Sequence, residues 1–214
     1  KLVPDDGSGS QTEWEDLQVA VDHGIIVIGH MGTNLSDGAA YVFADNQNGS
    51  WRSDGKLTAV DLGLADEFAG SVAVSGDVIA VGAPEWGQGV TGEGLVCIFE
   101  RAGVASWIER ERLTGEFGWR DQYGDSVSIS GGTLLVGAPM ADCSTRGGGR
   151  PGCNSGGAYA YQLYIPDCDG NLISDTCEIA NDPATLDCDG DGGLDSCQIL
   201  ADPSLDEDPD DDGI

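Results

Sequence analysis

Residues 71–84 of this chain recur at 126–139, and a looser copy occupies 18–30. The two closer copies both begin Ser-Val and both end Val-Gly-Ala-Pro. Their spacing is about 53 to 56 residues, a length at which an internal repeat indicates a solenoid or a propeller. The fold therefore has to be built from one small unit that is used several times.

Each copy predicts two short antiparallel strands joined by a tight turn, because apolar residues alternate on both sides of a glycine. We expect these turns at His23-Gly24, Ser75-Gly76 and Ser130-Gly131. A third strand follows a variable loop in every copy, and a fourth begins with tryptophan in two of them. The third strands are expected at 38–43, 94–99 and 156–161, and the fourth strands at 51–57 and 107–113. This pattern predicts an all-β fold of β-propeller-type, four-stranded antiparallel blades in three repeat units.

The repeats resemble the FG-GAP repeats of bacterial surface proteins and, more distantly, the propeller of integrin α chains. The resemblance rests on Phe68–Gly70 and Tyr123–Gly124, which are followed by Gly-Ala-Pro at 82–84 and 137–139. It covers about residues 1–164 and implies a β-propeller. Integrin-type blades often hold calcium between their first two strands. Here those connections are two-residue turns, too short to surround an ion that needs six to eight oxygens, so we expect no calcium in the blades.

The predicted strands do not begin and end at the boundaries of a repeat. Lys1–Val3 matches Lys56–Thr58 and Arg112–Thr114, which belong to fourth strands, whereas the third copy stops after its third strand. Residues 1–3 could close the last blade of the same molecule, complete the last blade of a neighbouring molecule, or belong to a larger propeller. Self-closure is the least favoured, because propellers usually have four to eight blades. Addition to a neighbour is attractive because an open blade edge exposes unpaired backbone groups.

Charge divides the chain into two parts. Of 214 residues, 38 are acidic and 9 are basic, for a net charge of -29, and there is no Lys or Arg after Arg150. Such a chain lacks the basic surface that nucleic acids or anionic membranes require, and no apolar run is long enough to span a bilayer. We expect FG-GAP-like blades over 1–165, as repeats at about 1–58, 59–114 and 115–164, and a calcium-binding part over 166–214.

The acidic part carries the twelve-residue spacing of an EF-hand-like calcium loop, beginning at Asp167 and again at Asp187. Alternate residues of such a loop point inward, so oxygen donors at positions 1, 3, 5, 9 and 12 and a backbone carbonyl at position 7 converge on one cation. A third copy begins at Asp208. The expected calcium ligands are Asp167, Asp169, Asn171, Ile173, Asp175 and Glu178; Asp187, Asp189, Asp191, Gly193, Asp195 and Gln198; and Asp208, Asp210 and Asp212.

This part resembles dockerin type I modules and thrombospondin type 3 repeats over about residues 166–214. Dockerins bind a cohesin module on another protein through two calcium loops and their helices. Here Pro183 and Pro203 end any helix within a turn, Leu172 replaces the usual glycine, and Gln198 cannot bind as a bidentate carboxylate. The resemblance therefore implies a calcium-stiffened tail more strongly than it implies cohesin binding.

The cysteines indicate an oxidising compartment. Cys143 and Cys153 flank a glycine-rich insertion and are expected to form a disulfide, whereas Cys97 lies within a strand and is expected to be a buried free thiol. The other four can pair in three ways: Cys168, Cys177, Cys188 and Cys197. Calcium is favoured over zinc because oxygen donors interleave these cysteines. Asn34 and Asn48 fit the N-glycosylation pattern.

No catalytic constellation is visible. His23 lies in a turn, and His30 stands where the other copies have alanine, while Trp51 and Trp107 are expected to pack between blades. The sequence thus indicates a non-catalytic, extracellular or cell-surface structural or adhesive protein whose only cofactor is Ca²⁺. Its partners would be other copies of itself or a surface scaffold protein. Two alternatives are a dockerin-type targeting module on a cohesin-like scaffold and a sugar-binding or hydrolytic propeller.

Replacing Asp167 and Asp187 together with alanine should abolish the protection from proteolysis that calcium gives the acidic part, because both loops lose their first ligand. Limited proteolysis with and without calcium measures this. Protection that is unchanged in the double variant would contradict the calcium assignment.

Overall fold

The computed structural model describes residues 2, 17–31, 38–46, 48–62, 66–87, 92–115, 121–141 and 156–163. All of them belong to the first of two units into which the chain divides, Lys1–Leu163. Every regular element in this described part is a β-strand, so the all-β prediction is confirmed. The expected boundary near residue 165 and the whole of 166–214 lie outside the described residues.

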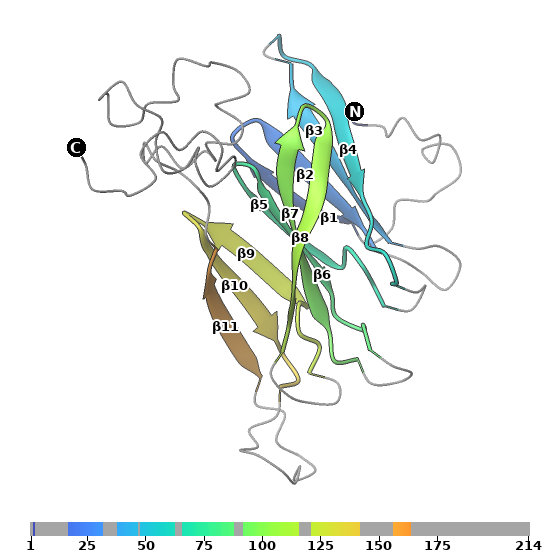
Figure 1. Cartoon of the computed structure of the whole chain (residues 1–214), viewed down its shortest axis with the longest axis vertical. Coiled ribbons are helices and arrows are strands. Elements are labelled where there is room, and N and C mark those ends of the chain that lie inside the picture. The colour runs from blue at the N-terminus through green and yellow to red at the C-terminus, as the bar shows by residue number, and fades with distance from the viewer. Residues whose placement is uncertain are drawn as a thin grey trace, which may run out of the picture. The chain divides into compact units, whose positions relative to one another are not determined.

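The strands form three antiparallel sheets, which we call blades 1, 2 and 3 (Figure 1). Each sheet follows chain order outward from its first strand, so the repeat unit of the sequence is also the structural unit. Blade 1 contains β1 (Leu17–Asp22), β2 (Ile25–His30), β3 (Ala39–Asp45) and β4 (Trp51–Leu57); blade 2 contains β5 (Ser71–Ser75), β6 (Val78–Ala83), β7 (Leu95–Gly103) and β8 (Ser106–Thr114); blade 3 contains β9 (Ser126–Ser130), β10 (Thr133–Ala138) and β11 (Gly157–Gln162).

The predicted strands are confirmed, with one-residue corrections at two turns. His23 and Gly24 form the first turn as expected, with φ of 40° and 75°. In blade 2 the pairing of Ser75 with Val78 places the turn one residue later than predicted, at 76–77, and in blade 3 it falls at 131–132. The serines instead end the strands, and each turn opens with a glycine at φ of 52° or 53°.

Blade 3 has three strands among the described residues, in the order β11-β10-β9. The edge of β11 is therefore unpaired within this part of the chain, whereas β3 and β7 each pair with a fourth strand.

The first strands of the blades lie beside one another, with β5 between β1 and β9. Side chains of each blade alternate between a leading face, toward the preceding blade, and a trailing face, toward the following one. The trailing face of blade 1 and the leading face of blade 2 form one apolar core. It includes Val27, Val42 and Leu57 from blade 1 and Val72, Ile79, Val81 and Phe99 from blade 2.

Cys97 of β7 belongs to this core and is a fully buried free thiol, as the sequence predicted. Burial, with a smaller contribution from Glu109, raises the pKa of the thiol to about 12. With such a pKa, on the order of one molecule in ten thousand carries the reactive thiolate at pH 8.

We therefore expect iodoacetamide at pH 8 to leave Cys97 unmodified in the folded protein and to alkylate it rapidly in guanidinium chloride. Peptide mapping by mass spectrometry measures alkylation of Cys97 alone, and the protein unfolded in guanidinium chloride is the control. Rapid alkylation of Cys97 under native conditions would show that the core between blades 1 and 2 opens readily.

Candidate interface between blades

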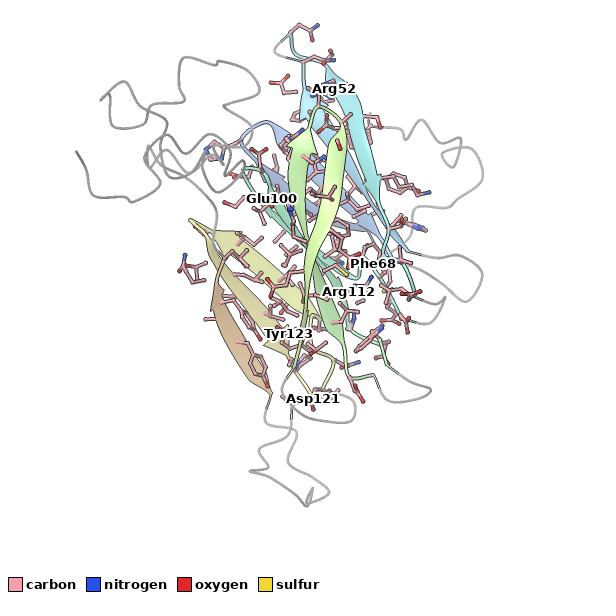
Figure 2. The ribbon with its side chains drawn as sticks, viewed as in Figure 1. Arg52, Phe68, Glu100, Arg112, Asp121 and Tyr123 are labelled. Carbon is pink, nitrogen blue, oxygen red and sulfur yellow. The ribbon has the colours of Figure 1, made fainter. Side chains whose placement is uncertain are left out.

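The aromatic residue of each Phe/Tyr-Gly motif lies where two blades meet (Figure 2). Phe68 is 3% exposed, and its ring meets Phe99 edge-on with centroids 6.4 Å apart. Tyr123 is fully buried and meets Tyr159 in the same manner at 5.4 Å. The equivalent residues preceding them, Glu67 and Gln122, have φ of 55° and 52°, so both copies turn the chain in the same way. Each aromatic ring thus anchors its motif on the third strand of its own blade.

Gly82 of the first Gly-Ala-Pro segment and its equivalent in blade 1, Gly29, let the next blade approach closely. A Cβ on Gly82 would lie 2.1 Å from the carbonyl oxygen of Gly124, and a Cβ on Gly29 would lie 2.6 Å from that of Ala69. No real side chain tolerates such contacts with backbone. Ser71 adds a hydrogen bond, donating its Oγ hydrogen to the carbonyl oxygen of Gly124 at 2.7 Å. The two halves of the motif, from successive blades, therefore make one contact.

Burial at this contact also changes the pKa of the Tyr123 hydroxyl. Desolvation, together with Tyr161 and Tyr159, raises the pKa of Tyr123 far above its ordinary range. The side chain therefore stays neutral and acts as a packing element between blades 2 and 3.

A buried ionic cluster joins blades 1 and 2. The Asp54 carboxylate, fully buried on β4, accepts hydrogen bonds from Arg101 at 2.6 Å and from Arg52. The Arg101 Nε also donates to Asp77 at 2.7 Å, and its guanidinium lies 4.4 Å from the Trp107 ring centroid. Since Asp54 comes from one blade and Arg101 from the next, the cluster fixes their register.

Trp107 is confirmed as a packing element between blades. Its ring lies against the core of blades 1 and 2, and its Nε1 hydrogen is directed at Asp54 with a separation of 3.3 Å. A Cβ on Gly55 would lie only 3.1 Å from this ring. Trp51 is the repeat equivalent in blade 1, yet it is 39% exposed. The difference arises because the leading face of blade 1 meets no earlier blade among the described residues.

Most of the site residues predicted from the sequence lie outside the described residues. This holds for Asn34, for every expected calcium ligand and for the six cysteines expected in disulfides: Cys143, Cys153, Cys168, Cys177, Cys188 and Cys197. Asn48 is exposed in the turn between β3 and β4, where its side-chain oxygen accepts a hydrogen bond from the Ser50 backbone at 3.0 Å.

The described residues hold no group of three or more His, Cys, Asp or Glu that could bind a metal. His23 is exposed and bonded to Asp22 at 2.7 Å, and Asp22 also accepts from the Gly76 backbone at 2.8 Å. Burial acts to raise the pKa of Asp22, but these hydrogen bonds outweigh it and the net shift is downward. His23 thus supports a contact between two hairpin turns. No described helix could cross a membrane.

A comparison with protein-family models finds a match in the blades. The FG-GAP repeat matches residues 51–99 and 107–161. These two stretches are similar to FG-GAP repeats. The matched segments span the fourth strand of one blade through the third strand of the next, so each contains the aromatic-glycine motif and the Gly-Ala-Pro segment that follows it. No curated protein matches the chain. The family resemblance seen in the sequence is therefore confirmed for the repeats, while the dockerin resemblance stays a prediction.

The ionic cluster was missed by sequence reasoning, because isolated charged residues in Trp-Arg-Ser-Asp and Phe-Glu-Arg runs carry no motif. Replacing Asp54 with alanine should lower the free energy of unfolding by about 3 kcal/mol, since the buried Arg101 loses a partner.

A matched control is Glu109→Ala, which removes the more accessible ion pair between Glu109 and Arg112 and should cost about 0.5 kcal/mol. Urea denaturation of both variants gives the comparison. Equal losses would mean that the buried cluster does not hold the two blades together.

Proposed function

We propose that this protein is a non-catalytic, extracellular structural or adhesive protein whose FG-GAP blades assemble with those of neighbouring molecules by strand addition. FG-GAP repeats are typical of integrin-like β-propellers, which are often adhesive and lie at the cell surface. The acidic part would be stiffened by Ca²⁺ and disulfides and would form an attachment segment.

The observation that carries this proposal is the position of Leu2. Leu2 packs on the leading face of blade 1 against Ile28, Ala39, Tyr41 and Phe43. Its repeat equivalent, Leu57 of β4, is buried between blades 1 and 2. Leu57 packs on the leading face of blade 2 as Leu2 packs on the leading face of blade 1. Leu2 therefore lies where the fourth-strand leucine of a preceding blade would lie.

Blade 3 offers the complementary edge. Its described strands end at β11, and the backbone groups along that edge have no fourth-strand partner in the described part of the chain. Residues 1–3 of one molecule, which match the fourth strands at 56–58 and 112–114, supply a strand of the right sequence for the β11 edge of another molecule. A head-to-tail contact of this kind, repeated, produces a ring or a filament.

Electron microscopy and sedimentation of the full chain, in calcium and after chelation, test the proposal. We expect rings or filaments in calcium that loosen on chelation. Leu2→Asp should prevent assembly because the added strand would bring a charge into a buried position, whereas Lys1→Ser should leave assembly intact. Assembly that is unaffected by Leu2→Asp would overturn strand addition, and single particles under every condition would overturn the structural role.

A further inference from the structure

The two internal blade interfaces of this chain show which residues meet when blades stack. On each trailing face, three side chains from neighbouring strands form a row. In blade 1 the row is Ala20, Val27 and Val42, and in blade 2 it is Ala73, Ala80 and Ile98. Five of the six side chains are buried, and Ala20 is partly buried, because a following blade covers both rows.

The corresponding row of blade 3 is open. Strand pairing aligns Ser128, Leu135 and Ala160, and all three are exposed, Leu135 at 50%. These side chains are uncharged and mostly small, like those of the two covered rows. The row differs from the covered ones in carrying Ser128 where they have alanine, and no described residue covers it.

Gly137 also indicates that the trailing face of blade 3 is suited to a neighbouring blade. Its equivalents Gly29 and Gly82 face the backbone of the next blade at distances that exclude a side chain. A Cβ on Gly137 would instead crowd only Ser126 of the same blade. The position retains the small residue that a close neighbour requires, and the three atoms nearest to the added Cβ all come from Ser126.

The leading face of blade 1 is open only along β1, because Ile28, Tyr41 and Phe43 on the same face are already buried. Val19 pairs with Ile28, which pairs with Tyr41, and this row is equivalent to Val72, Val81 and Cys97 of blade 2. Val72 is 9% exposed, whereas Val19 and the neighbouring Val21 are each 70% exposed. Two large apolar side chains of β1 are thus exposed, although their equivalents in blade 2, Val72 and Val74, are buried.

We propose that the trailing face of blade 3 in one molecule stacks on the leading face of blade 1 in a second copy, with Leu135 packed against Val19 and Val21. This inference rests on the proposed function and names the surface of the partner copy that the assembly uses. The occupant is a second copy because the same two kinds of face already meet twice within this chain. The contact is heterologous, so each molecule has one donor face and one acceptor face.

Electrostatics gives the interface a defined salt dependence. The facing rows contain no charged residue, but the whole chain has a net charge of -29, so copies repel one another at long range. At physiological ionic strength, dissolved salt screens charge repulsion at distances beyond about 8 to 10 Å. Assembly should therefore strengthen as sodium chloride is raised from low concentration at constant calcium.

Two single variants of the full chain test the interface. Leu135→Arg blocks the trailing face of blade 3, and Val19→Asp blocks the leading face of blade 1; both positions are exposed, so the fold should be retained. Analytical ultracentrifugation across a concentration series should show each variant as a monomer, with at least about a tenfold loss in association constant, equivalent to about 1.4 kcal/mol. Val104→Asp, at a 79% exposed hairpin tip, is the matched control and should assemble normally.

Mixing the two blocked variants gives the decisive result. The Leu135→Arg molecule keeps its leading face and the Val19→Asp molecule keeps its trailing face, so the mixture should form one-to-one dimers and nothing larger. Circular dichroism and thermal melting check that both variants remain folded. Normal assembly by either folded variant, or a mixture that stays monomeric, would overturn the stacking proposal.

The experiments distinguish failure of face stacking from failure of strand addition. Loss of assembly in Leu135→Arg but not in Leu2→Asp would support face stacking without an exchanged strand. The reverse result would leave strand addition standing and overturn the stacked interface. A wild-type chain that remains monomeric at every concentration and salt level would overturn both.

Discussion

Close approach of one blade to the next is the constraint on which the rest of this structure depends. Gly29 and Gly82 have no side chain, and the backbone of the following aromatic-glycine turn occupies the space where a Cβ would be. This proximity allows alternating valine, isoleucine and alanine side chains on facing sheets to exclude water, and apolar burial of this kind is the main favourable term in folding. A single blade has two such faces and cannot cover either by itself. The repeat is therefore a requirement of stability as well as a feature of the sequence.

The polar groups at the interface fix the register of the two sheets that apolar packing brings together. Apolar rows on flat sheets could slide relative to one another, but Asp54 of blade 1 meets Arg101 of blade 2 at one position only. Such a pair adds little net stability compared with apolar residues, although removing one member leaves a buried charge without its partner. Asp22 makes a similar link between the first hairpin turn and the backbone of Gly76. Both contacts fix the register of the two blades.

The three blades are not covered to the same extent. Blade 2 is covered on both faces, while blade 1 exposes Val19 and Val21, and blade 3 exposes Leu135. These exposed side chains and the open edge of β11 in the described part of the chain are the surfaces on which the proposed assembly depends. The proposed assembly uses the same interactions between molecules that hold the blades together within one.

The sequence by itself determined the strands, their antiparallel order and the repeat unit, because hydrophobic alternation and turn glycines act between near neighbours in the chain. It also predicted the buried thiol of Cys97 and the packing role of Trp107. It misplaced two turns by one residue, since serine and glycine both suit a turn and only strand pairing chooses between them. The Asp54–Arg101 pair and the open rows at Val19 and Leu135 were decided by tertiary structure alone. Each depends on which blade lies beside which, and that is a relation between residues far apart in the sequence.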